Sequence, residues 1–250
     1  MINRRRSFII GIKGLSLSKS EVLFIKKYKP WGIILFSRNV KNIEQLKKLT
    51  DKIKSINNDQ EFPIIVDQEG GRVSRLNKIL FTSIFSGEYF GEMYKKNIKN
   101  FSYHLDIYID QICYLLRIVG ININTSPIID LRKKNTSSVI GDRAFSSNPK
   151  IVKHIGKLFI EKFHKNKIAS VIKHIPGHGH AKKDSHFSTP NIYKDLKYLK
   201  KNDFFPFKSQ KSLFAMTAHI VYQKIDPFNT ATHSKKIIKL IRNEIKFKNI

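Results

Sequence analysis

The chain has 250 residues, 41% of them hydrophobic, which is enough for one large domain with a substantial core. Its 47 Lys and Arg against 19 Asp and Glu give a formal net charge of +28, but the basic residues are scattered and form only short runs such as Arg4-Arg5-Arg6. Because Lys, Asn, Ile and Phe are abundant and share A/T-rich codons, we attribute the charge to codon bias and expect no nucleic-acid partner. No segment approaches the ~18 consecutive apolar residues of a membrane span, so we expect no membrane partner.

Apolar runs with strand character alternate with helical patterns along the chain. In chain order the sequence predicts a strand at 8–12, a helix opening with the capping box Ser18–Glu21, a strand at 32–36, a helix after Asn42, a strand at 62–67, a helix at about 105–119, a strand at 121–124, a helix with Pro149 in its first turn, strands at 168–174 and 212–219, and a helix at 235–246 capped by Ser234. The stretch 81–101 shows no clear pattern.

This alternation, with continuous apolar strands, predicts a parallel sheet covered by helices, either doubly wound or most of an eight-stranded barrel. Residues able to do chemistry follow several different strands: Asp67, the pair Lys173-His174, and His219. Barrel enzymes build their sites at the carboxyl ends of many strands, whereas a doubly wound sheet gathers them at one switch point. We therefore predict an α/β fold of the TIM (β/α)8 type, as a single domain over residues 1–250.

The only cysteine and the N-terminus indicate the compartment. Cys113 lies in an apolar helical stretch and is predicted to be a core thiol, and a single cysteine excludes an internal disulfide. The start, "MINRRRSFIIGIKG", is basic, but its apolar run of roughly five residues is shorter than the ~7–15 of a signal peptide. We therefore expect a cytoplasmic protein.

The third predicted strand runs into "VDQEGGRVSRL", residues 66–76. Its two glycines permit a tight turn that leaves Asp67 at the strand end with Arg75 just beyond. An aspartate and a nearby arginine can hold sugar hydroxyls through charge-assisted hydrogen bonds, and the alternative is a surface salt bridge that closes a loop. We assign Glu69 to that alternative. In the polar loop "SSVIGDRAFSSNP", Arg143 could clamp a ligand, or Asp142 could cap a structural turn.

The stretch "KHIPGHGHAKKDSH", residues 173–186, holds four of the nine histidines. Lys173 and His174 end a strand and can face the mouth of a barrel. Asp184 and His186 can share one face of an extended turn, where the carboxylate would fix the histidine tautomer and make the pair a proton shuttle. The alternative is a zinc site, in which His178, His180 and His186 would be the ligands of a metal-dependent hydrolase.

Four motifs, "VDQEGGRVSRL", "SSVIGDRAF", "IKHIPGHGHAKKDSH" and "AMTAHIVY", together with "GIILFSRNV", closely resemble the bacterial β-N-acetylhexosaminidases of glycoside hydrolase family 3. The resemblance implies a (β/α)8 barrel that recycles cell-wall muropeptides in the cytoplasm by removing terminal β-linked N-acetylglucosamine with retention. It implies that the acid/base is His186 and its partner Asp184, and that the sugar is bound by Asp67, Arg75, Arg143, Lys173 and His174. No metal or other cofactor is expected, His178 would be a supporting residue, His180 a solvated one, and the complete protein a monomer.

The resemblance also implies an aspartate nucleophile just after a seventh strand, in a segment like "SDDL". This sequence ends at "RNEIKFKNI", where that strand would begin, and the later acidic residues Asp226 and Glu244 do not match the position. We therefore expect a barrel that lacks roughly its last two β/α units, is prone to aggregation and has little or no hydrolase activity. Two further alternatives are a non-catalytic sugar-binding remnant and a basic nucleic-acid binder whose affinity would fall steeply with salt.

Overall fold

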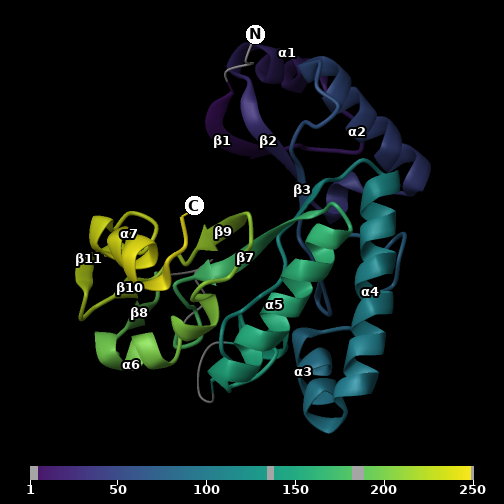
Figure 1. Cartoon of the computed structure of the whole chain (residues 1–250). Helices are drawn as coiled ribbons and strands as arrows, with labels where there is room; N and C mark the ends of the chain where they lie inside the picture. The colour runs from purple at the N-terminus through teal and green to yellow at the C-terminus, as the bar shows by residue number, and fades with distance from the viewer. Residues whose placement is uncertain (1–4, 134–137, 182–188, 249–250) are drawn as a thin grey trace.

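The structure is a computed structural model, and it describes residues 5–133, 138–181 and 189–248. Its main sheet has six parallel strands in the order β1-β2-β3-β6-β7-β9 (Figure 1). Their bounds are β1 Arg6–Gly11, β2 Pro30–Leu35, β3 Ile64–Val66, β6 Ile123–Asn124, β7 Ala169–Ile175 and β9 Phe214–Thr217. The six predicted strands are confirmed to within a few residues. Because all six strands run parallel, their carboxyl ends meet along one edge.

Helices α1 to α6 lie between strands of the main sheet along the chain, and α7 follows the last strand. They are α1 Lys19–Tyr28, α2 Ile43–Asn57, α3 Gly87–Lys96, α4 Ile98–Ile118, α5 Pro149–Lys165, α6 Leu196–Lys201 and α7 Lys235–Leu240, the last followed by a π-helical turn, Ile241–Ile245. The predicted caps are confirmed: Ser18 forms a capping box with Glu21, and Asn42 and Ser234 each accept a backbone hydrogen bond from their helix. The stretch 81–101, for which the sequence shows no clear pattern, contains α3 and the first turn of α4. Asn97 is the N-cap of α4.

A hairpin follows β3 directly and turns the chain back over the end of the sheet. It pairs β4, Gln68–Gly70, with β5, Val73–Ser74, in antiparallel fashion. Gly70 and Gly71 have φ values of 91° and 57°, and a Cβ on Gly70 would lie 2.2 Å from the carbonyl oxygen of Phe85. Only glycine fits this turn, and the turn returns the chain toward the end of β3.

The sheet is curled, so that side chains of distant strands meet on its inner face. Trp31 on β2 and Phe214 on β9 are separated by three strands of the sheet order, yet their ring centroids lie 5.4 Å apart in an edge contact. Between them, Ile65, Ile123 and Val171 form a small buried cluster. Within the described residues β1 and β9 do not pair with each other, so the sheet is a curled half-barrel, and closure into eight strands stays a prediction.

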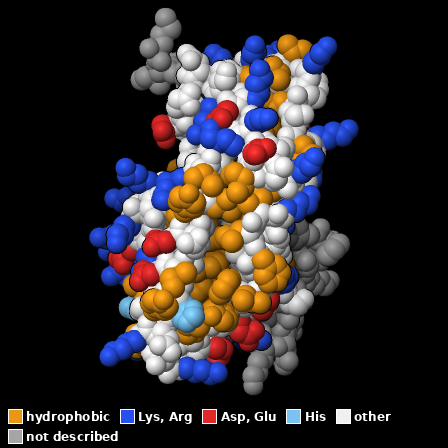
Figure 2. Space-filling view, turned by 90° about the vertical axis from the view of Figure 1, so that its right-hand side faces the viewer, with side chains coloured by type: hydrophobic (Ala, Val, Ile, Leu, Met, Phe, Trp, Pro, Cys, Tyr) orange, Lys and Arg blue, Asp and Glu red, His pale blue; other side chains and the backbone are white. Residues whose placement is uncertain are grey.

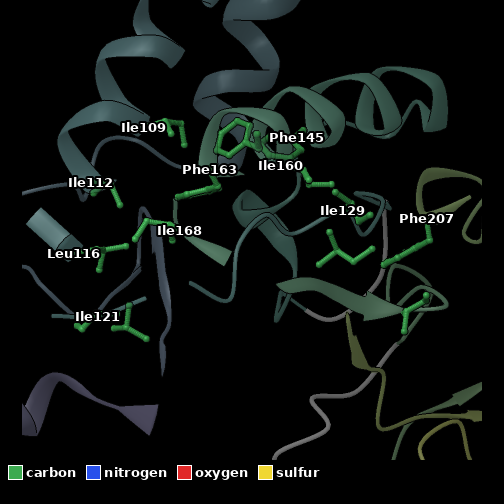
Figure 3. Close-up of a cluster of buried hydrophobic side chains, with 14 of the residues drawn as sticks. Ile109, Ile112, Leu116, Ile121, Ile129, Phe145, Ile160, Phe163, Ile168 and Phe207 are labelled. Carbon is green, nitrogen blue, oxygen red and sulfur yellow. The ribbon is translucent and has the colours of Figure 1, made fainter. Parts of the chain in front are cut away.

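The larger apolar core lies on the other face, between the sheet and its helices (Figure 3). Ile109, Ile112 and Leu116 of α4 pack toward Ile160 and Phe163 of α5. On each helix these residues recur every three or four positions and form an apolar stripe, as the sequence predicts. Cys113 is fully buried here, which confirms a core thiol, and burial raises its pKa to about 12.

The C-terminal part adds a second small sheet, in which β10 (Val221–Tyr222) lies between β8 (Asn191–Ile192) and β11 (Asp226–Thr230). On the α4 side of the molecule, apolar side chains gather between separate Lys and Arg side chains (Figure 2). The exposed apolar residues of α4 are Ile98, Tyr103, Ile107 and Tyr114. Among the helices of the described segments, none has the length and apolar character needed to cross a membrane.

Candidate active site

Asp67 follows β3 directly and is the centre of a charged cluster at the carboxyl edge of the sheet. Its Oδ1 accepts hydrogen bonds from the Thr125 hydroxyl and, at 2.9 Å, from Lys173 Nζ, while Arg75 Nη2 lies 3.8 Å from Oδ2. Burial raises the pKa of Asp67, but the Lys173 charge, the Thr125 and Lys173 hydrogen bonds and the Arg75 charge outweigh it and lower the pKa to about 2. Asp67 is therefore a fixed negative charge.

This depressed pKa makes part of the folding stability depend on pH. A carboxylate with a lowered folded pKa stabilises the fold above its ordinary pKa of 3.8, and this contribution disappears as the pH falls toward about 2. The shift corresponds to about 2 kcal/mol. We expect the loss of unfolding free energy between pH 5 and pH 2 to be smaller by about that amount in Asp67→Asn, measured by urea unfolding. Equal pH dependence in the two proteins would contradict the ion-paired state of Asp67.

Glu69 belongs to the same cluster, which corrects its assignment to a surface salt bridge. Its side chain is only 6% exposed, and its carboxylate accepts two hydrogen bonds from Arg143, at 2.8 and 2.9 Å. Lys173 Nζ lies 2.6 Å from Oε1. Burial raises the pKa of Glu69, but Lys173 and Arg143 lower it overall, and Glu69 in turn raises the pKa of Arg143 against the effect of burial. The alternation of a strand, which puts residues 67 and 69 on one face, was the sequence signal for it.

Lys173 joins the two carboxylates. It lies on β7 with a side chain 3% exposed, and its Nζ contacts Asp67, Glu69 and the Thr125 hydroxyl, the last at 2.9 Å. An ammonium group has three N–H donors, and these three acceptors use all of them. Lys173 therefore holds the acidic residues of the cluster in place.

The ring of His174, the next residue, contacts Asp130, which we did not select from the sequence. Nδ1 of His174 lies 2.7 Å from Oδ2 of Asp130, and Oδ1 of Asp130 accepts the backbone N–H of His178 at 2.7 Å. Asp130 is fully buried, and although burial raises its pKa, His174 and His178 lower it overall. Asp130 directly follows the apolar pair Ile128-Ile129, and Ile128 forms a β-bridge with β7. This position after an apolar stretch was the sequence signal that could have identified Asp130.

These groups surround a cavity of about 290 Å³, close to the lower end of the ~300–1,000 Å³ typical of ligand pockets. Its lining residues are Asp67, Glu69, Arg72, Val73, Arg75, Val139, Ile140, Arg143, Lys173, His174, His178 and Met216. All five predicted sugar-binding residues thus meet in one cavity, supplied by β3, the hairpin, the 138–146 loop and β7. A pocket with fixed charges of both signs can hold a small ligand rich in hydroxyl groups.

The predicted acid/base pair, Asp184 and His186, lies outside the described residues. His180 was predicted to be solvated, but its ring is only 14% exposed, and Nε2 lies 3.2 Å from the Tyr198 hydroxyl. Burial, with the Lys133 and Lys194 charges, lowers the pKa of His180 to about 4. Across the described segments, no three His, Cys, Asp or Glu side chains form a group that could hold a metal ion.

The two late acidic residues lie apart from this cavity. Asp226 begins β11 and accepts a hydrogen bond from the Ser234 hydroxyl at 2.6 Å, which helps to hold the start of α7. Glu244 lies in the π-helical turn and pairs with Lys200 at 3.1 Å. Neither lines the cavity, as the sequence indicated.

Comparison with known proteins identifies a matching family and similar proteins. Residues 10–250 match the family described as "Glycosyl hydrolase family 3 N terminal domain". The Beta-hexosaminidase of Alkalilimnicola ehrlichii is 32% identical over 95% of this chain and 68% of its own, and Beta-hexosaminidase A of Pseudoalteromonas piscicida is 32% identical over 90% of this chain. The chain spans only 41% of that second relative.

Solved structures agree. NagZ from Neisseria gonorrhoeae in complex with N-trifluoroacetyl-D-glucosamine superposes with a TM-score of 0.90 and 31% identity, over 98% of this chain and 73% of that one. Because the family match spans residues 10–250 and a relative of 32% identity is covered over 68% of its length, this chain belongs to glycoside hydrolase family 3 and carries that family's N-terminal domain.

Proposed function

We propose that the cavity binds a terminal β-linked N-acetylglucosamine, as part of a β-N-acetylglucosaminidase. The observation that carries this proposal is the convergence of Asp67, Arg75, Arg143, Lys173 and His174 on one cavity of sugar-binding size. The N. gonorrhoeae neighbour was solved with an N-acetylglucosamine analogue, which supports the same ligand class. The substrate would be a muropeptide or small oligosaccharide in the cytoplasm, and the complete protein would be a monomer.

The side chains that line the cavity differ in how far they are exposed. Lys173 and Glu69 are nearly inaccessible, whereas the side chains of Arg75 and His174 are 31% and 18% exposed. Arg75 can donate to hydroxyl or carbonyl oxygens of the sugar, and His174 Nε2 is the ring atom not used by Asp130. Charge-assisted hydrogen bonds of this kind are about twice as strong as neutral ones.

Hydrolysis with retention needs an acid/base and a nucleophilic carboxylate. In our proposal His186, tuned by Asp184, protonates the leaving oxygen. The carboxylates of the cavity are poor nucleophiles because each is bound by cations: Asp67 by Lys173 and Glu69 by Lys173 and Arg143. We therefore propose that the 250-residue chain binds the sugar but turns it over very slowly.

Calorimetric titration with N-acetylglucosamine tests the binding proposal. We expect measurable binding that is stronger than binding of glucose, and an affinity reduced at least about tenfold in Arg75→Met, because hydrogen bonds to charged groups contribute ~1.5–3 kcal/mol. The matched control is Arg132→Met, which removes an exposed arginine paired with Glu88 outside the cavity and should leave the affinity unchanged. Equal binding of glucose and N-acetylglucosamine, or none of either, would refute the proposal.

A further inference from the structure

Asp130 is a fully buried carboxylate that does not line the cavity, yet it accepts three donors from the turn that carries His174. Its Oδ2 accepts the His174 backbone N–H at 3.1 Å and faces His174 Nδ1 at 2.7 Å, and its Oδ1 accepts the His178 backbone N–H at 2.7 Å. One carboxylate thus satisfies three donors across the turn at the end of β7. These three hydrogen bonds fix the backbone of the turn and the His174 ring relative to one another.

The arrangement constrains the chemistry of His174. Each oxygen of Asp130 accepts a backbone N–H, as an ionised carboxylate does, and an ionised carboxylate accepts from Nδ1 of His174 when Nδ1 carries the proton. In the neutral ring the proton on Nδ1 leaves Nε2 as an acceptor. The His178 ring packs 5.5 Å from the His174 ring, centroid to centroid, and limits its rotation.

We propose that Asp130 is a positioning residue that holds His174 as its Nδ1–H tautomer, so that Nε2 accepts a hydrogen bond from a sugar hydroxyl in the cavity. The tautomer is a property of the free chain, and only its consequence for affinity rests on the proposed sugar-binding function. Asp130 acts through His174 and the turn and does not itself contact the ligand.

The tautomer can be read directly. In protein labelled with 15N in the histidine rings, at pH 8, we expect His174 to show a protonated Nδ1 and an unprotonated Nε2, the signals being assigned by their loss in His174→Gln. In Asp130→Asn a single amide oxygen replaces two carboxylate oxygens and cannot serve all three donors. We expect the Nε2–H form of His174 to appear in this variant, and N-acetylglucosamine affinity to fall about tenfold.

Two controls separate positioning from general damage. Asp203→Asn changes another buried carboxylate, packed against Gly177 and Gly179 of the same turn but not bonded to His174, and should leave the His174 tautomer unchanged. In a His174→Gln background, Asp130→Asn should weaken sugar binding by less than about twofold more, because the residue acts through His174.

The outcomes are distinguishable. A protonated Nε2 on His174 in the unaltered chain, or an unchanged tautomer in a folded Asp130→Asn, overturns the inference whether or not sugar binds. If Asp130→Asn does not fold, the tautomer of the unaltered chain still decides. Absence of N-acetylglucosamine binding by the unaltered chain, with the expected tautomer present, rejects the proposed function and leaves the role of Asp130 in holding the ring.

Discussion

Replacement of Lys173 by methionine should lower the free energy of unfolding by about 3–5 kcal/mol at pH 7 and abolish N-acetylglucosamine binding. Methionine keeps the length of the side chain but removes the charge that lies between Asp67 and Glu69. Both carboxylates are largely buried, with side chains 15% and 6% exposed, and would keep only Arg75 near Asp67 and Arg143 on Glu69 as cationic partners. Removing the shared partner of two buried charges is among the most destabilising changes that a single substitution makes.

The pH dependence of this variant gives a second readout. Without Lys173 the pKa values of Asp67 and Glu69 should rise, because the charge that lowers them is gone and burial raises them. Protonation then removes a buried charge that has lost one of its partners, so the loss of stability should be smaller at pH 4 than at pH 7 in urea unfolding. The matched control is Lys157→Met on α5, a 62% exposed lysine 3.6 Å from Glu161, which should cost less than about 0.5 kcal/mol. A loss below about 1 kcal/mol for Lys173→Met would contradict the proposed role of the ammonium group.

On a chromogenic β-N-acetylglucosaminide, the 250-residue chain should have a kcat/KM at least about 10⁴-fold below that of a full-length family 3 β-hexosaminidase. A site whose carboxylates are held by cations lacks a free nucleophile among them, and removal of a nucleophile commonly costs this much or more in other hydrolases. Among the described residues that line the cavity, Asp67 and Glu69 are the only carboxylates, and both are paired with cations.

Binding separates this expectation from simple misfolding. A chain that binds N-acetylglucosamine with the sensitivity to Arg75→Met described above, but turns over slowly, supports an intact sugar site with deficient chemistry. Turnover within about tenfold of a full-length relative would refute the expectation, and would require an acid or nucleophile that the cavity as described does not reveal. Addition of a chelator should leave the residual rate unchanged, whereas a loss of rate would favour the metal-dependent alternative.

Local patterns were sufficient for most of the elements. The six main strands and the caps at Ser18, Asn42 and Ser234 depend on residues close in sequence, and all are present. The stretch 81–101 could not be read because α3 is short and its register depends on close backbone approach: a Cβ on Gly91 would lie 1.6 Å from the carbonyl oxygen of Phe145. Such a contact, over a long sequence separation, leaves no periodic signal.

The residues of the candidate site likewise differ in whether the sequence could identify them. Asp67, Arg75, Arg143, Lys173 and His174 could be selected because each follows a strand or lies in a turn rich in glycine, and these positions meet at one edge of a parallel sheet. Glu69 was misassigned because an acidic residue in a turn looks solvated until the packing of Tyr108 and Arg143 around it is known. Asp130 was overlooked because its partners, His174 and His178, are more than forty residues away along the chain.

The sequence by itself determined the family, the alternation of strands and helices, and the residues that could bind a sugar, since these depend on local periodicity and on motifs. Only the tertiary structure decided which charges neutralise one another and which remain open to a ligand. Burial and distance control both properties: the same Lys173 that reads as a sugar ligand in sequence is 3% exposed and bound to two carboxylates once the sheet curls.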